Sequence, residues 1–497
     1  MGLYSTRDAY DVADPPAFSI DQMVDQIGVL ADRALFRGSM DFIDRAKDLS
    51  TRIDAQKLAR PQLAVFHYHV SNIWGNAFKL LQKTQDQFPA WEQSEIEKQL
   101  IHNRLAVAAL EADNGESPET VVCSIITNLA NTLFQVGRFI EAQAHWDKVI
   151  SLKTDFGMAI ANRGLAMLHY AHLLPDPEHA LHYLIQARIN LQAALKKTQM
   201  EPHARLIFQS HLKTLKCVLP KHVNRQLLTA VEPDAAFQDD ESDFSHWRLK
   251  NRLFLNPLND LGCFEEGAND ILFQFPFNKN PSIQPLLHSY YQTLTREFVF
   301  SNRLFFEAVK CISGIGRDPV VPDIPDASCK NCFHDLEKLK ISFRMAYSLF
   351  DKIAFFLRKY FDFPVPEKRV NFRTVWYRSG KKSNGLHVSL MESHNWPLRG
   401  LFWLSKDLYD NRPDFRNGLE SDVRELYAIR NHLEHKYLML ETDCYGSENP
   451  FGSRAISASD FSNRGLRVLK MVRAALIYLA LSVYREENPD RPDTITY

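Results

Sequence analysis

The chain has 497 residues, of which 45% are hydrophobic and 24% charged, and its formal net charge is −1. These values exclude a disordered, fibrous or collagen-like protein, and the length exceeds what one hydrophobic core usually serves. A net charge near zero attracts no polyanion to the whole surface, so contact with nucleic acid must depend on a local basic patch.

The N-terminal segment and the cysteines indicate the compartment. No basic segment followed by an apolar one opens the chain, and no apolar stretch of roughly 18 residues occurs in it. Seven scattered cysteines include one close pair, Cys329 and Cys332, which suits a reducing compartment. This pair lacks the second pair that a zinc site would need, so we expect no metal site. The sequence predicts a cytoplasmic protein that does not bind a membrane.

Internal periodicity is clearest between Thr127 and Leu195. Asn128 and Asn162, each at the start of a helical pattern, stand 34 residues apart, which is the period of the tetratricopeptide repeat (TPR). The second unit is longer than the first, so the repeat is imperfect. We expect residues 1–230 to form a TPR-like helical array that binds an unidentified protein or peptide partner. The alternative is an unrelated helical bundle.

The stretch VEPDAAFQDDESD then interrupts the helical pattern with proline and acidic residues. Such a stretch is typical of a linker, which we expect at 231–245. Residues 246–324 are predicted to be a connecting helical region. They contain the phrase LFLNPLNDLG (253–262), whose Asn-Pro and Asn-Asp steps favour turns.

Apolar periodicity predicts four long helices in the rest of the chain, at 285–310, 333–361, 422–441 and 461–485. We expect them to form a helical bundle whose domain covers residues 325–497. Residues 363–420 are rich in proline, glycine and aromatic side chains and are too long for a simple connection, so they are predicted to be an insertion. The fold class of the whole chain is therefore predicted to be all-α.

The predicted helix 422–441 carries the sequence RNHLEH, in which Arg430, Asn431 and His435 are candidate catalytic residues. Asn431 and His435 share one helix face, and the long Arg430 side chain can reach the same region. A histidine can move the proton of an RNA 2′-hydroxyl or leaving oxygen, and an arginine can stabilise charge on the phosphate. This chemistry needs no metal ion or other cofactor. His432 and Glu434 are accessory candidates.

One such helix supplies a single arginine and a single histidine. Two copies that face each other across a two-fold axis would form a fuller composite site. We therefore expect a homodimer whose two 422–441 helices meet.

The hexad from Arg430 to His435 resembles the R-x4–6-H motif of HEPN domains, including the polar residue after the arginine. With the LFLNPLNDLG phrase and the TPR-like array, the chain resembles a TPR-linked HEPN family of prokaryotes, over most of its length from about residue 246 onward. The resemblance implies a dimeric helical bundle that acts as a metal-independent endoribonuclease in anti-phage defence or a toxin system. It also implies a site made of Arg430, Asn431 and His435. The alternatives are a non-catalytic TPR/HEPN interaction scaffold and a nucleotide-binding partner module.

A second candidate feature is the run of basic and aromatic residues at 358–382. This combination suits single-stranded RNA, because cations contact phosphates and rings stack on bases. The alternative is an insertion whose aromatic residues are core and whose charges are solvated. The residues expected to contact RNA are Arg369, Arg373, Trp376, Tyr377, Arg378, Lys381 and Lys382.

Overall fold

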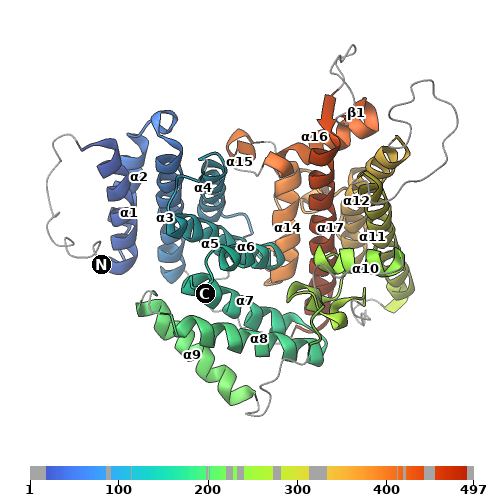
Figure 1. The fold of residues 1–497 in the computed structure, drawn as a ribbon, viewed down its shortest axis with the longest axis horizontal. Coiled ribbons are helices and arrows are strands. Elements are labelled where there is room, and N and C mark those ends of the chain that lie inside the picture. Colours follow the sequence, from blue (N-terminus) through green and yellow to red (C-terminus); the bar gives the residue numbers. More distant parts are fainter. Residues whose placement is uncertain are drawn as a thin grey trace. The chain divides into compact units, whose positions relative to one another are not determined.

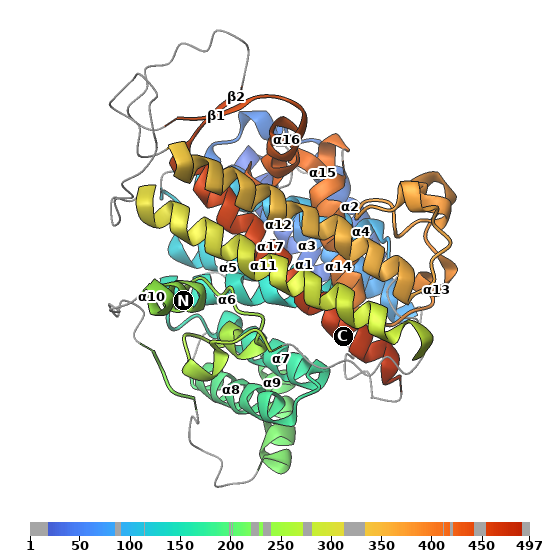
Figure 2. The same cartoon turned by 90° about the vertical axis from the view of Figure 1, so that its right-hand side faces the viewer.

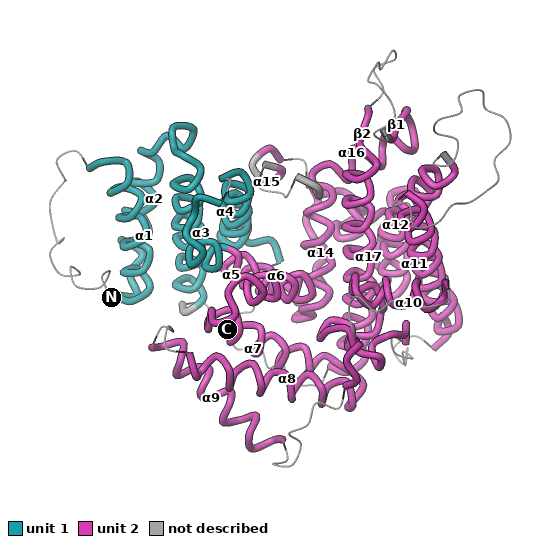
Figure 3. The backbone as a smooth tube through the Cα atoms, in the orientation of Figure 1, with its two compact units in different colours: residues 1–125 teal, residues 126–497 magenta. Residues whose placement is uncertain are grey.

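The computed structural model describes residues 18–84, 91–113, 115–197, 200, 202–219, 228–231, 240–271, 281–312, 333–410, 412–417, 421–441 and 454–489. These ranges are predominantly helical, which confirms the predicted all-α fold (Figure 1). The chain divides into two compact units, residues 1–125 and 126–497 (Figure 3). Within the described ranges, no helix combines the length and the apolar character that a membrane span requires.

The first unit is a small helical body with its own apolar core. Ser19 and Gln22 form a capping box at its first helix, which ends at Gly38 with a φ of 64°. Ile27, Ile43 and Ile73 are completely buried between the first three long helices. The elements are α1 (Ile20–Arg37), α2 (Met40–Thr51), the 3-10 turn η1 (Ala55–Lys57), α3 (Arg60–Thr84), α4 (Ser94–Glu111) and the start of α5 (Glu119–Gln135).

The second unit begins with the helices that the sequence predicts as repeats. After α5 come α6 (Phe139–Leu152), α7 (Gly157–Leu173), α8 (Pro177–Leu195) and α9 (Pro202–Val218). Asp176 caps α8, because its carboxylate accepts the backbone N–H of Glu178 at 2.8 Å. α5 and α7 end near the turns that the repeat pattern predicts, and α7 packs against α8, but Asn128 and Asn162 lie within α5 and α7 rather than at their starts, which corrects that part of the prediction. Their identity as TPR units stays a prediction. The single array at 1–230 stays a prediction as well, because the boundary between the two compact units falls inside it, after residue 125.

A bundle of long helices forms the C-terminal part of the second unit. Its central helix, α17, is buried along most of its length and packs against the other four long helices of the bundle. In Figure 2 α11, α12 and α17 run side by side. The long helices are α11 (Gln284–Ile312), α12 (Phe333–Tyr360), α14 (Trp396–Tyr409), α16 (Ser421–His435) and α17 (Ala458–Glu487).

Three of the four predicted bundle helices match α11, α12 and α17 closely, whereas the helix predicted at 422–441 ends earlier. α16 stops at His435, and residues 438–441 form a short strand, β1 (Leu438–Glu441), parallel to β2 (Arg454–Ser457). The apolar residues Leu438 and Leu440 continue the helical pattern in the sequence, but strand pairing determines their conformation. Pairing partners of a strand are not visible in local periodicity.

The predicted insertion at 363–420 contains a helix that belongs to the core of the bundle. Trp396, Trp403 and Leu404 of α14 are at most 2% exposed, and α14 packs against α16 and α17. α14 is buried on nearly all sides, and even its polar residues Arg399, Lys406 and Asp407 are enclosed. The remaining elements here are short: η5 (Glu367–Arg369), η6 (Arg378–Gly380), η7 (Lys382–Asn384), α13 (Val388–Met391) and α15 (Pro413–Asn417).

The predicted linker at 231–245 overlaps a helix, α10 (Asp240–Lys250). Its first turn is acidic, which favours a helix N-terminus. Arg303 of α11 forms ion pairs with Asp240 and Glu241. The rings of Phe244 and Trp247 pack α10 against Phe306 of α11. Residues 232–239 of the predicted linker lie outside the described ranges.

The LFLNPLNDLG phrase connects the repeat-like helices to the bundle. Around it lie the short turns η2 (Pro257–Asp260), η3 (Glu265–Gly267) and η4 (Pro281–Ile283). Oδ1 of Asp260 accepts a hydrogen bond of 2.5 Å from Nη1 of Arg473 in α17, and both side chains are buried. Gln143 of α6 donates to the Asp260 carbonyl at 2.6 Å, and the Tyr183 hydroxyl of α8 donates to the Pro257 carbonyl at 2.8 Å. One loop thus contacts two repeat-like helices and the central helix.

A second connection between the repeat-like helices and the bundle lies at the turn between α5 and α6. Arg138 forms a buried ion pair with Asp407 of α14, and the Tyr478 hydroxyl of α17 donates to Glu141. Gly137 in this turn has a φ of 89°, and a Cβ there would collide with the backbone of α14. The repeat-like helices therefore pack directly on the bundle through buried polar contacts.

Candidate active site

The RNHLEH sequence lies in the last two turns of α16. Leu426 and Ile429 are completely buried and attach the helix to the bundle. Arg430 and Asn431 follow at the edge of this apolar side and are half-buried. Nη1 of Arg430 donates to Oδ1 of Asn431 at 3.2 Å. The structure thus brings two of the three candidate catalytic residues together.

His435 is separated from this pair. Five helical residues after Arg430, its side chain leaves α16 at an angle of about 140° from that of Arg430. It is exposed, and among the described residues no hydrogen bond joins it to Arg430. Within one chain Arg430 and His435 therefore do not contact each other directly, but the pKa of Glu434 is lowered chiefly by Arg344, and the charges of Arg430 and His435 both help to lower it.

The two accessory candidates have structural partners. Nδ1 of His432 lies 2.7 Å from the Ala428 carbonyl one turn earlier, so that nitrogen is engaged by its own helix. The Glu434 carboxylate accepts a hydrogen bond of 3.1 Å from Nε of Arg344 in α12. This hydrogen bond lowers the pKa of the Glu434 carboxyl group. Glu434 therefore ties the motif helix to α12.

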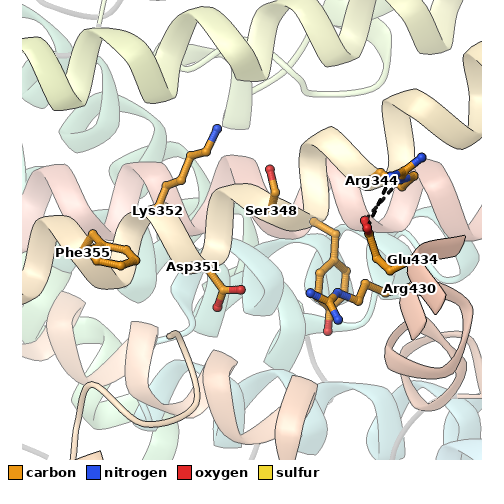
Figure 4. Close-up of a pocket in the computed structure, with 8 residues that line it drawn as sticks. Arg344, Ser348, Asp351, Lys352, Phe355, Arg430 and Glu434 are labelled. Carbon is orange, nitrogen blue, oxygen red and sulfur yellow. Dashed lines mark hydrogen bonds and ion pairs between the residues drawn. The ribbon is translucent and has the colours of Figure 1, made fainter. Parts of the chain in front are cut away.

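A pocket of about 220 Å³ opens between α12 and α16 (Figure 4). Arg430 and Glu434, one turn apart, line it from α16. The α12 side consists of residues at helical spacing that the sequence analysis did not single out: Arg344, Tyr347, Ser348, Asp351, Lys352 and Phe355. The sequence offers little signal for these residues, because charged side chains occur along most of α12.

Asp351 is the carboxylate that α12 contributes to this pocket, and it is half-buried. Its Oδ1 accepts the backbone N–H of Phe372 at 2.9 Å. Burial raises the pKa of Asp351, and this effect is opposed by the Phe372 hydrogen bond and by the charge of Arg430. Burial likewise raises the pKa of the neighbouring Tyr347 hydroxyl. The Arg430 guanidinium therefore lies in a partly desolvated pocket with a carboxylate whose charge attracts it.

The basic and aromatic run at 358–382 divides into a buried and an exposed part. Trp376 is completely buried, its indole N–H donates to the Phe372 carbonyl at 2.8 Å, and Tyr377 is 5% exposed. Buried rings cannot stack on bases, which corrects the prediction that Trp376 and Tyr377 contact RNA. Arg369 is half-buried, and the exposed basic residues of the run are Lys359, Lys368, Arg373, Arg378, Lys381 and Lys382.

Within the part of the chain that the structure describes, no group of three or more His, Cys, Asp or Glu side chains could hold a metal ion. Cys329 and Cys332 lie outside that part.

Comparison with known proteins adds one finding to this geometry. Residues 279–486 match the family model described as LA2681-like HEPN, and this range includes α11, α12, α14, α16 and α17. No curated protein and no solved structure matches the chain. The match covers the whole pocket and the RNHLEH sequence, but not the repeat-like helices.

Proposed function

Because residues 279–486 form a HEPN domain of the LA2681-like family, we propose that this protein is an endoribonuclease whose active site contains Arg430, Asn431 and His435. The observation that carries the proposal is the position of Arg430. It belongs to an R-x4-H motif, lines a pocket in the matched domain and is held there by Asn431. A fixed guanidinium at a pocket is suited to a phosphodiester, since it offers several donors to phosphate oxygens.

In the proposed reaction the 2′-hydroxyl oxygen attacks the adjacent phosphorus. A bond from O2′ to phosphorus forms, the bond from phosphorus to O5′ breaks, and a 2′,3′-cyclic phosphate and a 5′-hydroxyl result. His435 moves a proton, either from the 2′-hydroxyl or to the leaving 5′-oxygen. Arg430 stabilises the negative charge that accumulates on the phosphate oxygens in the transition state. Neither role calls for a metal ion or cofactor.

The divergence of Arg430 and His435 supports a homodimer as the active unit. Within one chain the two side chains point in different directions from α16, so a single phosphate cannot easily engage both. A two-fold axis beside α16 would let Arg430 of one chain and His435 of the other meet. The exposed side chains of Tyr437 and Met439, which follow α16, offer apolar surface for such a contact.

For the rest of the chain we infer a sensing or partner-binding role. Repeat-like helices bind proteins or peptides in other solenoids, and the buried contacts of α6 with the bundle and of α8 with the 253–262 loop would transmit such binding. We propose a cytoplasmic enzyme of anti-phage defence or of a toxin system, in line with its resemblance to TPR-linked HEPN proteins and with its scattered cysteines.

The proposal is tested by incubating the purified chain with RNA in EDTA. We expect cleavage to continue under chelation, with products that carry 2′,3′-cyclic phosphate and 5′-hydroxyl ends. Cleavage that stops in EDTA and returns with a divalent ion would contradict the proposed chemistry. Binding of RNA with no cleavage in any condition would favour the non-catalytic scaffold, and binding of a free nucleotide alone would favour the nucleotide-binding module.

We also propose that the exposed basic residues of the 358–382 run attract RNA to the site. The variant with Arg369, Arg373, Lys381 and Lys382 all changed to Gln should bind RNA more weakly, and the slope of log affinity against log salt should flatten by about 0.7 per lost phosphate contact. The rate at saturating RNA should persist, because Arg430 and His435 are unchanged. Titrations at several salt concentrations measure both effects. If affinity and slope equal those of the wild type, the run is a solvated surface.

A further inference from the structure

One face of α12 presents a row of side chains beside Arg430. Arg344, Ser348 and Lys352 follow one another at intervals of four residues, and Phe355 continues the row (Figure 4). Residues at this spacing lie one above the other on a helix surface. Arg344 and Lys352 are therefore about 12 Å apart along the axis of α12, given a rise of roughly 1.5 Å per residue.

Both cations of this row are accessible, since their side chains are 48% and 45% exposed. Each forms an ion pair with a carboxylate of another helix: Arg344 with Glu434 of α16 and Lys352 with Glu297 of α11. Ion pairs at this exposure contribute little to stability, so a phosphate can replace either carboxylate at small cost. The third carboxylate, Asp351, is partly engaged by the Phe372 backbone N–H.

The end of the row is aromatic. Phe355 is 37% exposed although it is a large apolar side chain, and it lines the same pocket. Cations along a groove together with an accessible ring are the combination that binds single-stranded nucleic acid, in which phosphates contact the cations and an unpaired base stacks on the ring.

We propose that this face of α12 is a subsite for the single-stranded RNA that flanks the cleaved bond. Arg344 and Lys352 contact backbone phosphates on one side of the scissile phosphate, and Phe355 stacks on a base. When RNA binds, Arg344 exchanges Glu434 for a phosphate. This inference rests on the proposed ribonuclease function, because it places the scissile phosphate at Arg430.

The test compares the wild type with the double variant Arg344→Gln/Lys352→Gln on two substrates. One is a single-stranded oligonucleotide of about ten nucleotides, long enough to fill a typical single-strand site. The other is a dinucleoside monophosphate, which contains only the scissile phosphate. A matched control, Lys213→Gln/Lys216→Gln, removes the same charge from exposed lysines of α9 in the same unit.

For the oligonucleotide we expect KM of the double variant to rise roughly tenfold or more per lost cation, since charged hydrogen bonds have that strength. The salt slope should flatten by about 1.4, or 0.7 for each contact. The value of kcat should stay near that of the wild type. For the dinucleoside monophosphate, kcat/KM should be the same in both proteins, and the control variant should behave as the wild type on both substrates.

Two results would overturn the subsite. Either KM and salt slope for the oligonucleotide equal those of the wild type, or the dinucleoside monophosphate is affected as strongly as the oligonucleotide. Fluorescence anisotropy of the labelled oligonucleotide in EDTA separates this question from the proposed function. If the wild type binds RNA through Arg344 and Lys352 but does not cut it, the ribonuclease proposal fails and the binding site remains. If it cuts RNA with no contribution from these residues, only the subsite fails.

Discussion

Replacing Arg430 or His435 by alanine is expected to lower RNA cleavage by at least about a hundredfold, the usual effect of removing a proton-transfer group or a donor to a developing anion. The fold should persist, because both side chains lie at the edge of α16 and the buried residues Leu426 and Ile429 are unchanged. Single-turnover cleavage and far-UV circular dichroism measure the two properties. Asn431→Ala should have a smaller effect, since it removes only the contact that positions Arg430.

Mixing the two inactive variants tests the composite site. In a random mixture half of the dimers are heterodimers, and one of the two sites in each would combine an intact Arg430 with an intact His435. The mixture should therefore regain about a quarter of wild-type activity if the dimer forms as proposed. Light scattering verifies the dimer beforehand. Recovery would be absent if both residues act within one chain, and wild-type activity in both alanine variants would show that the site lies elsewhere.

Replacing Arg473 by methionine is expected to destabilise the second unit by about 3–5 kcal/mol, the cost of leaving one partner of a buried ion pair alone. Arg473 and Asp260 are 1% and 2% exposed, so water cannot replace the lost guanidinium. The carbonyl groups of Phe254 and Asn256 lose a donor in the same step. Urea denaturation followed by circular dichroism measures the loss.

A matched change at the surface provides the control. Lys340→Met removes a partly exposed pair with Glu337 in α12 and should cost at most about 1 kcal/mol. The double variant Arg473→Met/Asp260→Leu should recover part of the lost stability, because it removes the isolated carboxylate but still leaves two carbonyl groups without their donor. Equal destabilisation by Arg473→Met and Lys340→Met would mean that the buried Arg473–Asp260 pair does not stabilise the contact between α17 and the 253–262 loop.

Local pattern predicted most of the helices, because α11 and α12 each bury one face and expose another, and α17 has exposed or half-buried polar residues near its two ends. It failed for α14, whose residues Trp396 and Trp403 are buried in a helix that has almost no exposed side. It also extended α16 into β1, because Leu438 and Leu440 fit a helical period. Both failures occur where tertiary contacts, rather than amphipathic spacing, decide the conformation.

The candidate site was predictable only in its α16 half. Arg430 and Asn431 stand in a short motif and could be read directly, whereas Arg344 contacts Glu434 across 90 residues of sequence. The basic run at 358–382 was visible by composition, but composition does not distinguish an accessible ring from a core ring. The residues around Trp376 in the sequence would look the same whether its ring were accessible or buried. Only the packing of the insertion against the bundle buries it.

The buried contacts between α6 and the bundle limit how this protein can be divided or recombined. A fragment that starts at residue 279, where the family match begins, would leave Asp407 without Arg138 and Arg473 without Asp260. A chimera that exchanges the repeat-like helices must therefore also carry Arg138, Glu141 and the 253–262 phrase. Because these contacts are buried and polar, changes to the repeat-like helices that keep the fold have to be confined to the outer surfaces of α5 to α9.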